Sequence, residues 1–92
     1  MTTPPPSPVA ERVLEVLRAR DGTATEVRLH DGRTCTVFNV AWGQDFEDPE
    51  YHITSNISPD IDGASMDFFF TNHVVALVDP ATGTILYDRD AH

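Results

Sequence analysis

The chain has 92 residues, a formal net charge of -9, one cysteine and no lysine. This length suits one small domain, and so small a domain buries only about two thirds of its unfolded surface, which keeps self-association open. The single Cys35 excludes an internal disulfide. The longest apolar run is far below the roughly twenty residues that span a bilayer, and MTTPPPSP lacks the parts of a secretory signal. We therefore expect a cytoplasmic protein with no membrane contact.

The charge is unevenly distributed. Residues 1–42 contain five acids and five arginines, whereas residues 43–92 contain ten acids and only Arg89. An acidic face repels phosphate backbones and attracts cations or basic proteins. This pattern makes nucleic acid an improbable partner, although acidity that serves only solubility remains an alternative.

An amphipathic helix is predicted after a proline-rich leader. Residues 1–6 are expected to be disordered because they have no apolar pattern to pack. Ser7 and Pro8 are typical of a helix cap and first turn, and Gly22 is a stop signal. Between them the apolar residues fall on one stripe: Val9, Val13, Val16 and Leu17.

Two strands joined by Asp31-Gly32 follow the helix. A strand at 25–29 alternates, and a three-residue turn with Gly32 in the left-handed conformation pairs Val27 with Cys35, which keeps apolar residues together. From Val37 to Trp42, apolar residues occupy the positions that face both sides of the strand. This second strand is therefore either covered on both faces or bent at a bulge.

The rest of the chain also reads as strands. We predict a short strand at 51–56, a loop at 57–64 and a strand at 66–71. In the strand at 66–71, we expect Phe68 and Phe70 to pack in the core. Phe69 faces the other side, and we expect it to lie under the helix or in an interface.

A hairpin closes the pattern. Strands at 74–78 and 84–87 flank the turn sequence DPATG, and Asn72-His73 forms a tight corner before them. Taking residues 79–83 as the loop makes every cross-strand pair apolar. The predicted pairs are Leu77 with Ile85, Val75 with Tyr87, and Ala76 with Leu86.

These elements predict an α+β domain at residues 7–88, followed by a tail at 89–92. The N-terminal helix packs on a strongly curved antiparallel sheet or a small Sm/SH3-like β-barrel of five to six strands. TEVRLHDGRTCTVF and FFFTNHVVALV resemble the opening and closing strands of Sm-like small β-barrels, and the resemblance covers most of residues 8–78. It implies ring assembly and RNA binding, with Asn72-His73 matching the histidine at this corner in the bacterial branch.

Other residues depart from the family pattern. The segment after Trp42 is acidic and has no Asp-x-x-Met-Asn pattern, and Cys35-Thr36 stands where a second glycine is expected. These departures count against RNA binding by this chain.

The stretch GQDFEDPEYHIT holds the main candidate residues. Its carboxylates and histidine suit magnesium or calcium, or manganese or zinc once the histidine takes part, and three aspartates from later segments could join. The calcium-loop and zinc-motif spacings are missing, so a solvated turn is the competing interpretation. The candidate metal ligands are Asp45, Glu47, Asp48, Glu50 and His52, with Asp60, Asp62 and Asp67 as additions.

No catalytic constellation is apparent. Cys35 has the inward parity of its strand and is expected to be a core residue. His30 and His92 are assigned to the surface. His73 lies between the aromatic strand and the last hairpin, where a structural role is the main interpretation and a functional role the alternative. The glycines are scattered over separate turns, so no phosphate loop is expected.

The function favoured by the sequence is a non-enzymatic binding or assembly module for a basic protein, without a cofactor. A homo-oligomer formed through a strand edge or the apolar helix face is also possible. The alternatives are metal-dependent activity at residues 45–52 and Sm-like RNA binding. The candidate partner-binding residues are Asp45, Glu47, Asp48, Glu50 and His73.

Overall fold

Helix α1 spans Pro8–Ala19 in a computed structural model that describes residues 5–45, 47–57 and 65–90. The Ser7 hydroxyl accepts a hydrogen bond from the Ala10 amide at 3.0 Å, and a proline occupies the first turn. Gly22 has φ +83°, and its amide donates to the Phe38 carbonyl at 2.7 Å. The predicted start and stop of the helix are confirmed.

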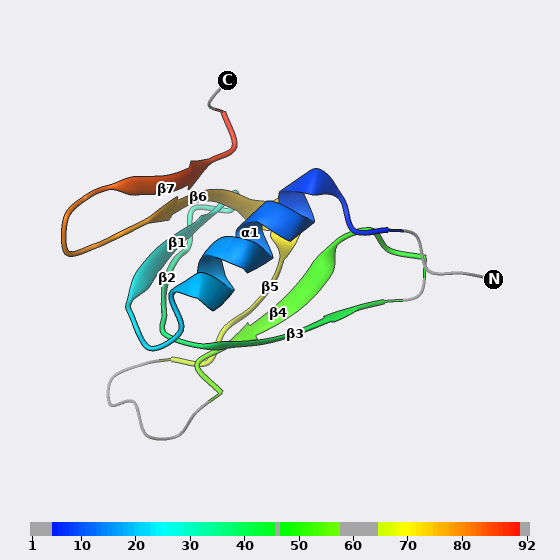
Figure 1. The fold of residues 1–92 in the computed structure, drawn as a ribbon, viewed down its shortest axis with the longest axis horizontal. Helices are drawn as coiled ribbons and strands as arrows, with labels where there is room; N and C mark the ends of the chain where they lie inside the picture. Colours follow the sequence, from blue (N-terminus) through cyan, green and yellow to red (C-terminus); the bar gives the residue numbers. More distant parts are fainter. Residues whose placement is uncertain (1–4, 46, 58–64, 91–92) are drawn as a thin grey trace.

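The described strands form two open antiparallel sheets (Figure 1). One has the order β2-β1-β6-β7 and the other β3-β4-β5, and a 3₁₀ turn, η1, joins β5 to β6. The bounds are β1 Thr25–Leu29, β2 Thr34–Val37, β3 Val40–Gln44, β4 Tyr51–Ser55, β5 Phe68–Phe70, η1 Thr71–His73, β6 Val74–Val78 and β7 Ile85–Asp88. The α+β class is confirmed, with seven strands instead of five or six, and no closed barrel is formed by the part of the chain described.

The extra strand arises because the second predicted strand breaks. β2 and β3 belong to different sheets and are separated by Phe38 and Asn39. Asn56 holds this bend: its side-chain oxygen accepts from the Phe38 amide at 2.8 Å, and its nitrogen donates to the Thr36 and Ser65 carbonyls at 2.8 and 2.7 Å. Of the two explanations offered for apolar residues on both sides of this strand, the bend is therefore the correct one.

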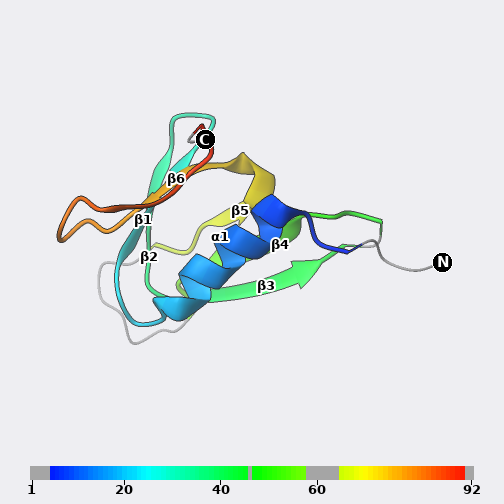
Figure 2. The same ribbon diagram turned by 45° about the horizontal axis from the view of Figure 1, so that its top comes forward.

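The core lies between the two sheets and α1. Figures 1 and 2 both show α1 lying across the space between the sheets. The helix buries Ala10, Val13, Leu14, Val16 and Leu17 there. Because this apolar face is covered within one chain, the helix face is not the free oligomer contact suggested by the sequence. The strand partners in the same core include Val27, Val37, Ile53, Phe69, Val74 and Leu77.

The first hairpin has the predicted register. Val27 pairs with Cys35 and Thr25 with Val37, and Gly32 has φ +92°. The last hairpin does not: Leu77 pairs with Tyr87 and Val78 with Ile85, so Leu86 is an extra residue at this step. The prediction of uninterrupted apolar pairs was wrong: Leu77 faces Tyr87 instead of Ile85, a difference of two residues along β7, of which the bulge at Leu86 accounts for one.

The orientation of β5 also differs from the expectation. Phe69 is 1 % exposed, whereas Phe68 is 53 % exposed and Phe70 is partly buried. The core assignment was therefore wrong for Phe68. Phe69 occupies the inward position, opposite Ile53 of β4.

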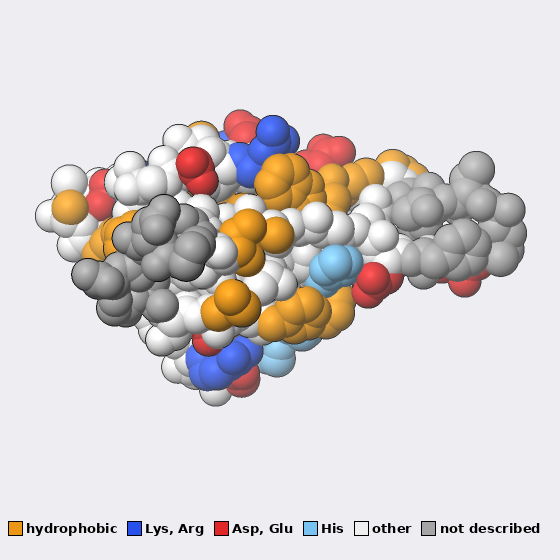
Figure 3. Space-filling model, turned by 90° about the horizontal axis from the view of Figure 1, so that it is seen from below, with side chains coloured by type: hydrophobic (Ala, Val, Ile, Leu, Met, Phe, Trp, Pro, Cys, Tyr) orange, Lys and Arg blue, Asp and Glu red, His pale blue; other side chains and the backbone are white. Residues whose placement is uncertain are grey.

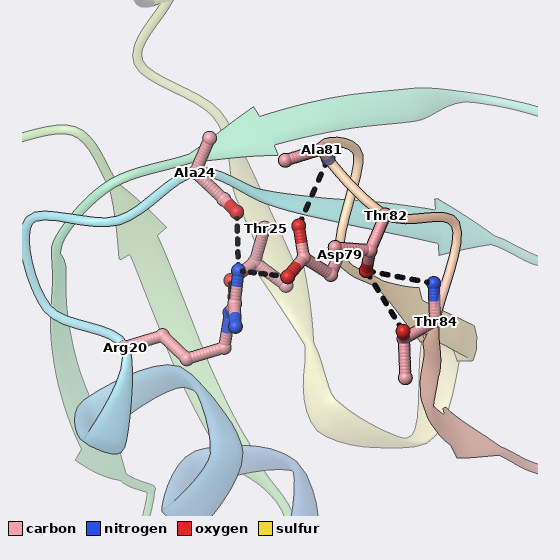
Figure 4. Close-up of polar contacts among 7 residues, drawn as sticks. All are labelled: Arg20, Ala24, Thr25, Asp79, Ala81, Thr82 and Thr84. Carbon is pink, nitrogen blue, oxygen red and sulfur yellow. Dashed lines mark hydrogen bonds and ion pairs between the residues drawn. The ribbon is translucent and has the colours of Figure 1, made fainter.

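Arg20 connects the end of α1 to both hairpins of the larger sheet (Figure 4). Its guanidinium donates to the Thr25 hydroxyl and the Ala24 carbonyl, each at 2.8 Å, and lies 3.6 Å from the Asp79 carboxylate. The other Asp79 oxygen accepts from the Ala81 amide at 2.9 Å. One partly buried arginine thus fixes the helix end against the turn between β6 and β7.

No helix in the described ranges is long and apolar enough to cross a membrane.

Candidate functional site

The acidic turn, defined by Asp45, Glu47, Asp48 and Glu50, joins β3 to β4. The Asp48 carboxylate accepts from the Glu50 amide at 2.9 Å, and the Asp48 amide donates to the Asp45 carbonyl at 3.1 Å. Gln44 also donates its side-chain amide to the Asp48 carbonyl at 2.8 Å. Part of the acidity therefore shapes the turn itself, as the solvated-turn interpretation requires.

The four carboxylates do not point to a common centre. Glu50 is partly buried and accepts from the Thr71 hydroxyl at 2.9 Å, which in turn accepts from the Tyr51 amide at 3.1 Å. Thr71 is fully buried, so this contact fixes η1 against β4. Asp45 and Glu47 are exposed and remain the two carboxylates of the turn that a partner can reach.

His52 is held against β3 at the end of this turn. Its Nε2 lies 3.3 Å from the Asp45 carboxylate, and its cross-strand partner is Gly43. A Cβ at position 43 would lie 2.8 Å from two atoms of the His52 ring. Glycine at this position therefore leaves the space that the imidazole occupies over the backbone of β3.

From His52 a continuous line of rings crosses the smaller sheet and reaches η1. We call His52, Phe68, Phe70, His73 and His30 the aromatic–histidine strip. Successive ring centroids are 6.1, 5.5, 5.4 and 4.7 Å apart, in the order given. The first contact is stacked and the other three are edge-to-face.

The face shown in Figure 3 carries hydrophobic side chains with histidines beside them. An acidic side chain also lies next to one of the histidines in this view (Figure 3). Phe68 is 53 % exposed and His30 is exposed, so the strip is open to solvent at more than one point.

The predicted site residues are thus brought together only in part. Asp45 and His52 meet, and His73 joins the same surface through the phenylalanines. Glu50 and Asp48 turn to internal partners, and Asp67 faces Cys35. Asp60, Asp62 and His92 lie outside the described residues. Within the described ranges, no three histidine, cysteine or acidic side chains are grouped to hold a metal ion.

Cys35 is 5 % exposed, as its predicted inward parity requires. Burial raises the pKa of its thiol, and the nearby Asp67 carboxylate, through its charge and a hydrogen bond, raises that pKa further. Since the thiolate is the reactive form, Cys35 is an inert core thiol near neutral pH.

Alkylation of Cys35 tests this arrangement. Because the folded-state pKa is raised, the thiol stays protonated as the pH climbs past the titration of an unfolded cysteine, and native stability falls in that alkaline range. In an iodoacetamide pH series, Asp67→Asn should move the midpoint of the alkylation rate to lower pH. A faster rate with an unchanged midpoint would instead indicate loosened structure and contradict the assigned role of Asp67.

Two open hollows flank α1. One, of about 470 Å³, is lined by Glu11, Leu14, Glu15, Arg18, Ala19 and Tyr51. The other, of about 320 Å³, is lined by Ser7, Val9, Glu50, Asn72 and Arg89. Each pairs acidic with basic side chains, and the Ser7 hydroxyl in the second is engaged as the cap of α1, where it accepts from the Ala10 amide.

Sequence reasoning placed His30 at the surface correctly, but it missed Phe68 and Phe70 as the residues that join the histidines into one strip. The available signal was the two-residue period of FFF, in which burying Phe69 necessarily turns its neighbours to the opposite face.

Comparison with protein-family models, with characterised proteins and with solved structures gave no match. The functional argument therefore depends on the geometry of the chain itself.

Proposed function

We propose that this chain is a non-enzymatic binding module that takes a basic segment of another protein on the side formed by β4, β5 and the acidic turn. The observation that carries the proposal is the pair of exposed carboxylates, Asp45 and Glu47, beside an exposed aromatic surface. Residues 43–88 contain no lysine or arginine to neutralise them. Complementary charge would accelerate encounter and select basic partners.

As part of this proposal we regard the fold as an opened variant of the Sm- and SH3-like small barrels. The bend between β2 and β3 and the short η1 turn before β6 support that view. Ring assembly and RNA binding would follow from the resemblance, but the acidity of this face disfavours a phosphate backbone. A cytoplasmic location and the absence of a cofactor belong to the same proposal.

The metal-dependent alternative has weaker support. A metal ion would have to compete for Asp48 and Glu50 with the hydrogen bonds that already shape the turn. Asp45 and His52 alone leave most of a coordination shell to water, so any such site would be weak.

The test is a titration with a fluorescein-labelled peptide of alternating arginine and glycine. Asp45→Asn combined with Glu47→Gln should weaken binding by about two- to thirty-fold, because exposed charge pairs are each worth only about 0.2–1 kcal/mol. Added salt should weaken binding to the native chain and have less effect on the variant.

A matched control removes two charges elsewhere. Glu11 and Asp21 are exposed and lie on α1 and just beyond it. Glu11→Gln combined with Asp21→Asn gives the same net charge and should leave the affinity nearly unchanged. Equal weakening by both double variants would mean that only net charge matters and would overturn a localised site, and no binding at low salt would overturn the module itself.

A further inference from the structure

We propose that the aromatic–histidine strip is the contact surface for an arginine-bearing, extended segment of the partner, with the acidic turn supplying charge at one end. This inference rests on the proposed function and deepens it, because it identifies the surface and the side chain that the surface recognises.

The first step is the exposure of Phe68. Burying a phenylalanine side chain stabilises a protein, so one left 53 % exposed is a candidate contact for another molecule. Its neighbour Phe69 is buried, and Phe70 is partly buried beside it. β5 therefore supplies the core with one ring and the surface with the rings on either side.

The second step is the rigidity of the strip. The His52 ring is fixed by the Asp45 carboxylate, by the space over Gly43 and by stacking on Phe68. At the other end, the His30 amide donates to the His73 carbonyl at 2.9 Å while the two rings meet edge-to-face. A preformed surface of this kind loses little conformational entropy on binding.

The third step is the choice of arginine. A guanidinium stacks on aromatic faces and pairs with carboxylates, and the strip and Asp45 offer both at adjacent positions. The same protein already shows such a contact, since the Arg18 guanidinium carbon lies 4.8 Å from the centre of the Trp42 ring. That contact lies on the other face of the smaller sheet, because Trp42 pairs with the buried Ile53. It shows only that an arginine of this chain packs on an exposed aromatic ring.

Other occupants fit less well. Single-stranded nucleic acid also stacks on aromatic rings, but its binding grooves are positively charged, whereas β4, β5 and η1 contain no lysine or arginine. The two arginines that flank His30 in the first hairpin are each paired with an acidic side chain: Arg28 with Glu26, and Arg33 with Asp31. In an isologous contact with a second copy, the acidic turns of both chains would lie in the same interface. Each chain carries a formal charge of -9, so the two copies would repel each other. Charge complementarity therefore favours a basic protein segment.

The experiment compares two peptides of equal charge, one with arginine and one with lysine alternating with glycine. The arginine peptide should bind the native chain about two- to five-fold more tightly, from the usual strength of exposed cation–π contacts. Phe68→Ala and Phe68→Leu should each abolish that preference, because leucine keeps apolar bulk but has no π face. The control Ile85→Ala removes an exposed apolar side chain of β7, outside the strip, and should retain the preference.

The outcomes separate the two proposals. If both peptides bind equally and the Phe68 variants have no effect, while the Asp45 and Glu47 double variant still weakens binding, the strip inference fails and the acidic module stands. If neither peptide binds, both proposals fail. Tighter binding of an oligouridylate than of the arginine peptide, or self-association of the native chain that Phe68→Ala removes, would also overturn the strip inference.

Discussion

Replacing Phe69 with alanine is expected to lower the free energy of unfolding by about 3–5 kcal/mol, since the side chain is 1 % exposed and packs in the core. That is a large part of the roughly 5–14 kcal/mol expected for a domain of this size. Urea unfolding followed by circular dichroism measures the difference.

The adjacent variant Phe68→Ala is its matched control. The same atoms are removed from a side chain that is 53 % exposed, so we expect a loss below about 1 kcal/mol. Comparable losses for the two variants, or a larger loss for Phe68→Ala, would contradict the orientation of β5 on which the aromatic–histidine strip depends.

Replacing Asn56 with alanine is expected to cost about 3–5 kcal/mol. The side chain is 6 % exposed and makes three hydrogen bonds, to the Phe38 amide and to the Thr36 and Ser65 carbonyls. Leaving a buried polar group unsatisfied costs about 1–3 kcal/mol. Alanine also tolerates the left-handed φ of +56° less well than asparagine does.

Asn56→Gly separates these contributions. Glycine adopts the left-handed conformation freely, so it should be more stable than the alanine variant by about 1 kcal/mol and still well below the native chain. Both variants are followed by thermal and urea unfolding. A native-like alanine variant would show that the bend between β2 and β3 does not need the Asn56 side chain.

The parts of the fold set by local signals could be predicted from the sequence. Ser7 and Pro8 determine where α1 begins, and Gly32 determines the register of the first hairpin because only a left-handed residue closes that turn. Both features depend on a few neighbouring residues, which is why the sequence pattern was sufficient for them.

The parts set by long-range packing could not be predicted in the same way. Phe68, Phe69 and Phe70 allow either face of β5 to be the buried one, and the choice depends on the position of Ile53 in another strand. The register of the last hairpin was predicted wrongly for a related reason. The strand β7 has a bulge opposite Leu77 and Val78, and matching apolar residues along two strands does not reveal a bulge.

The candidate site shows the same division. The acidic residues were evident in the sequence, but which of them stay free was not, since Glu50 is turned inward by Thr71 from a segment 21 residues away. The joining of His52 to His73 through Phe68 and Phe70 depends on the pairing of β4 with β5 and on the turn that follows.

The most direct measurement is a residue-resolved map of amide chemical shifts during titration with the arginine peptide. The account predicts that the largest changes fall on Asp45, His52, Phe68, Phe70 and His73, with little change along α1 and β7. Changes centred on α1 or β7, with those five amides unmoved at saturation, would contradict it.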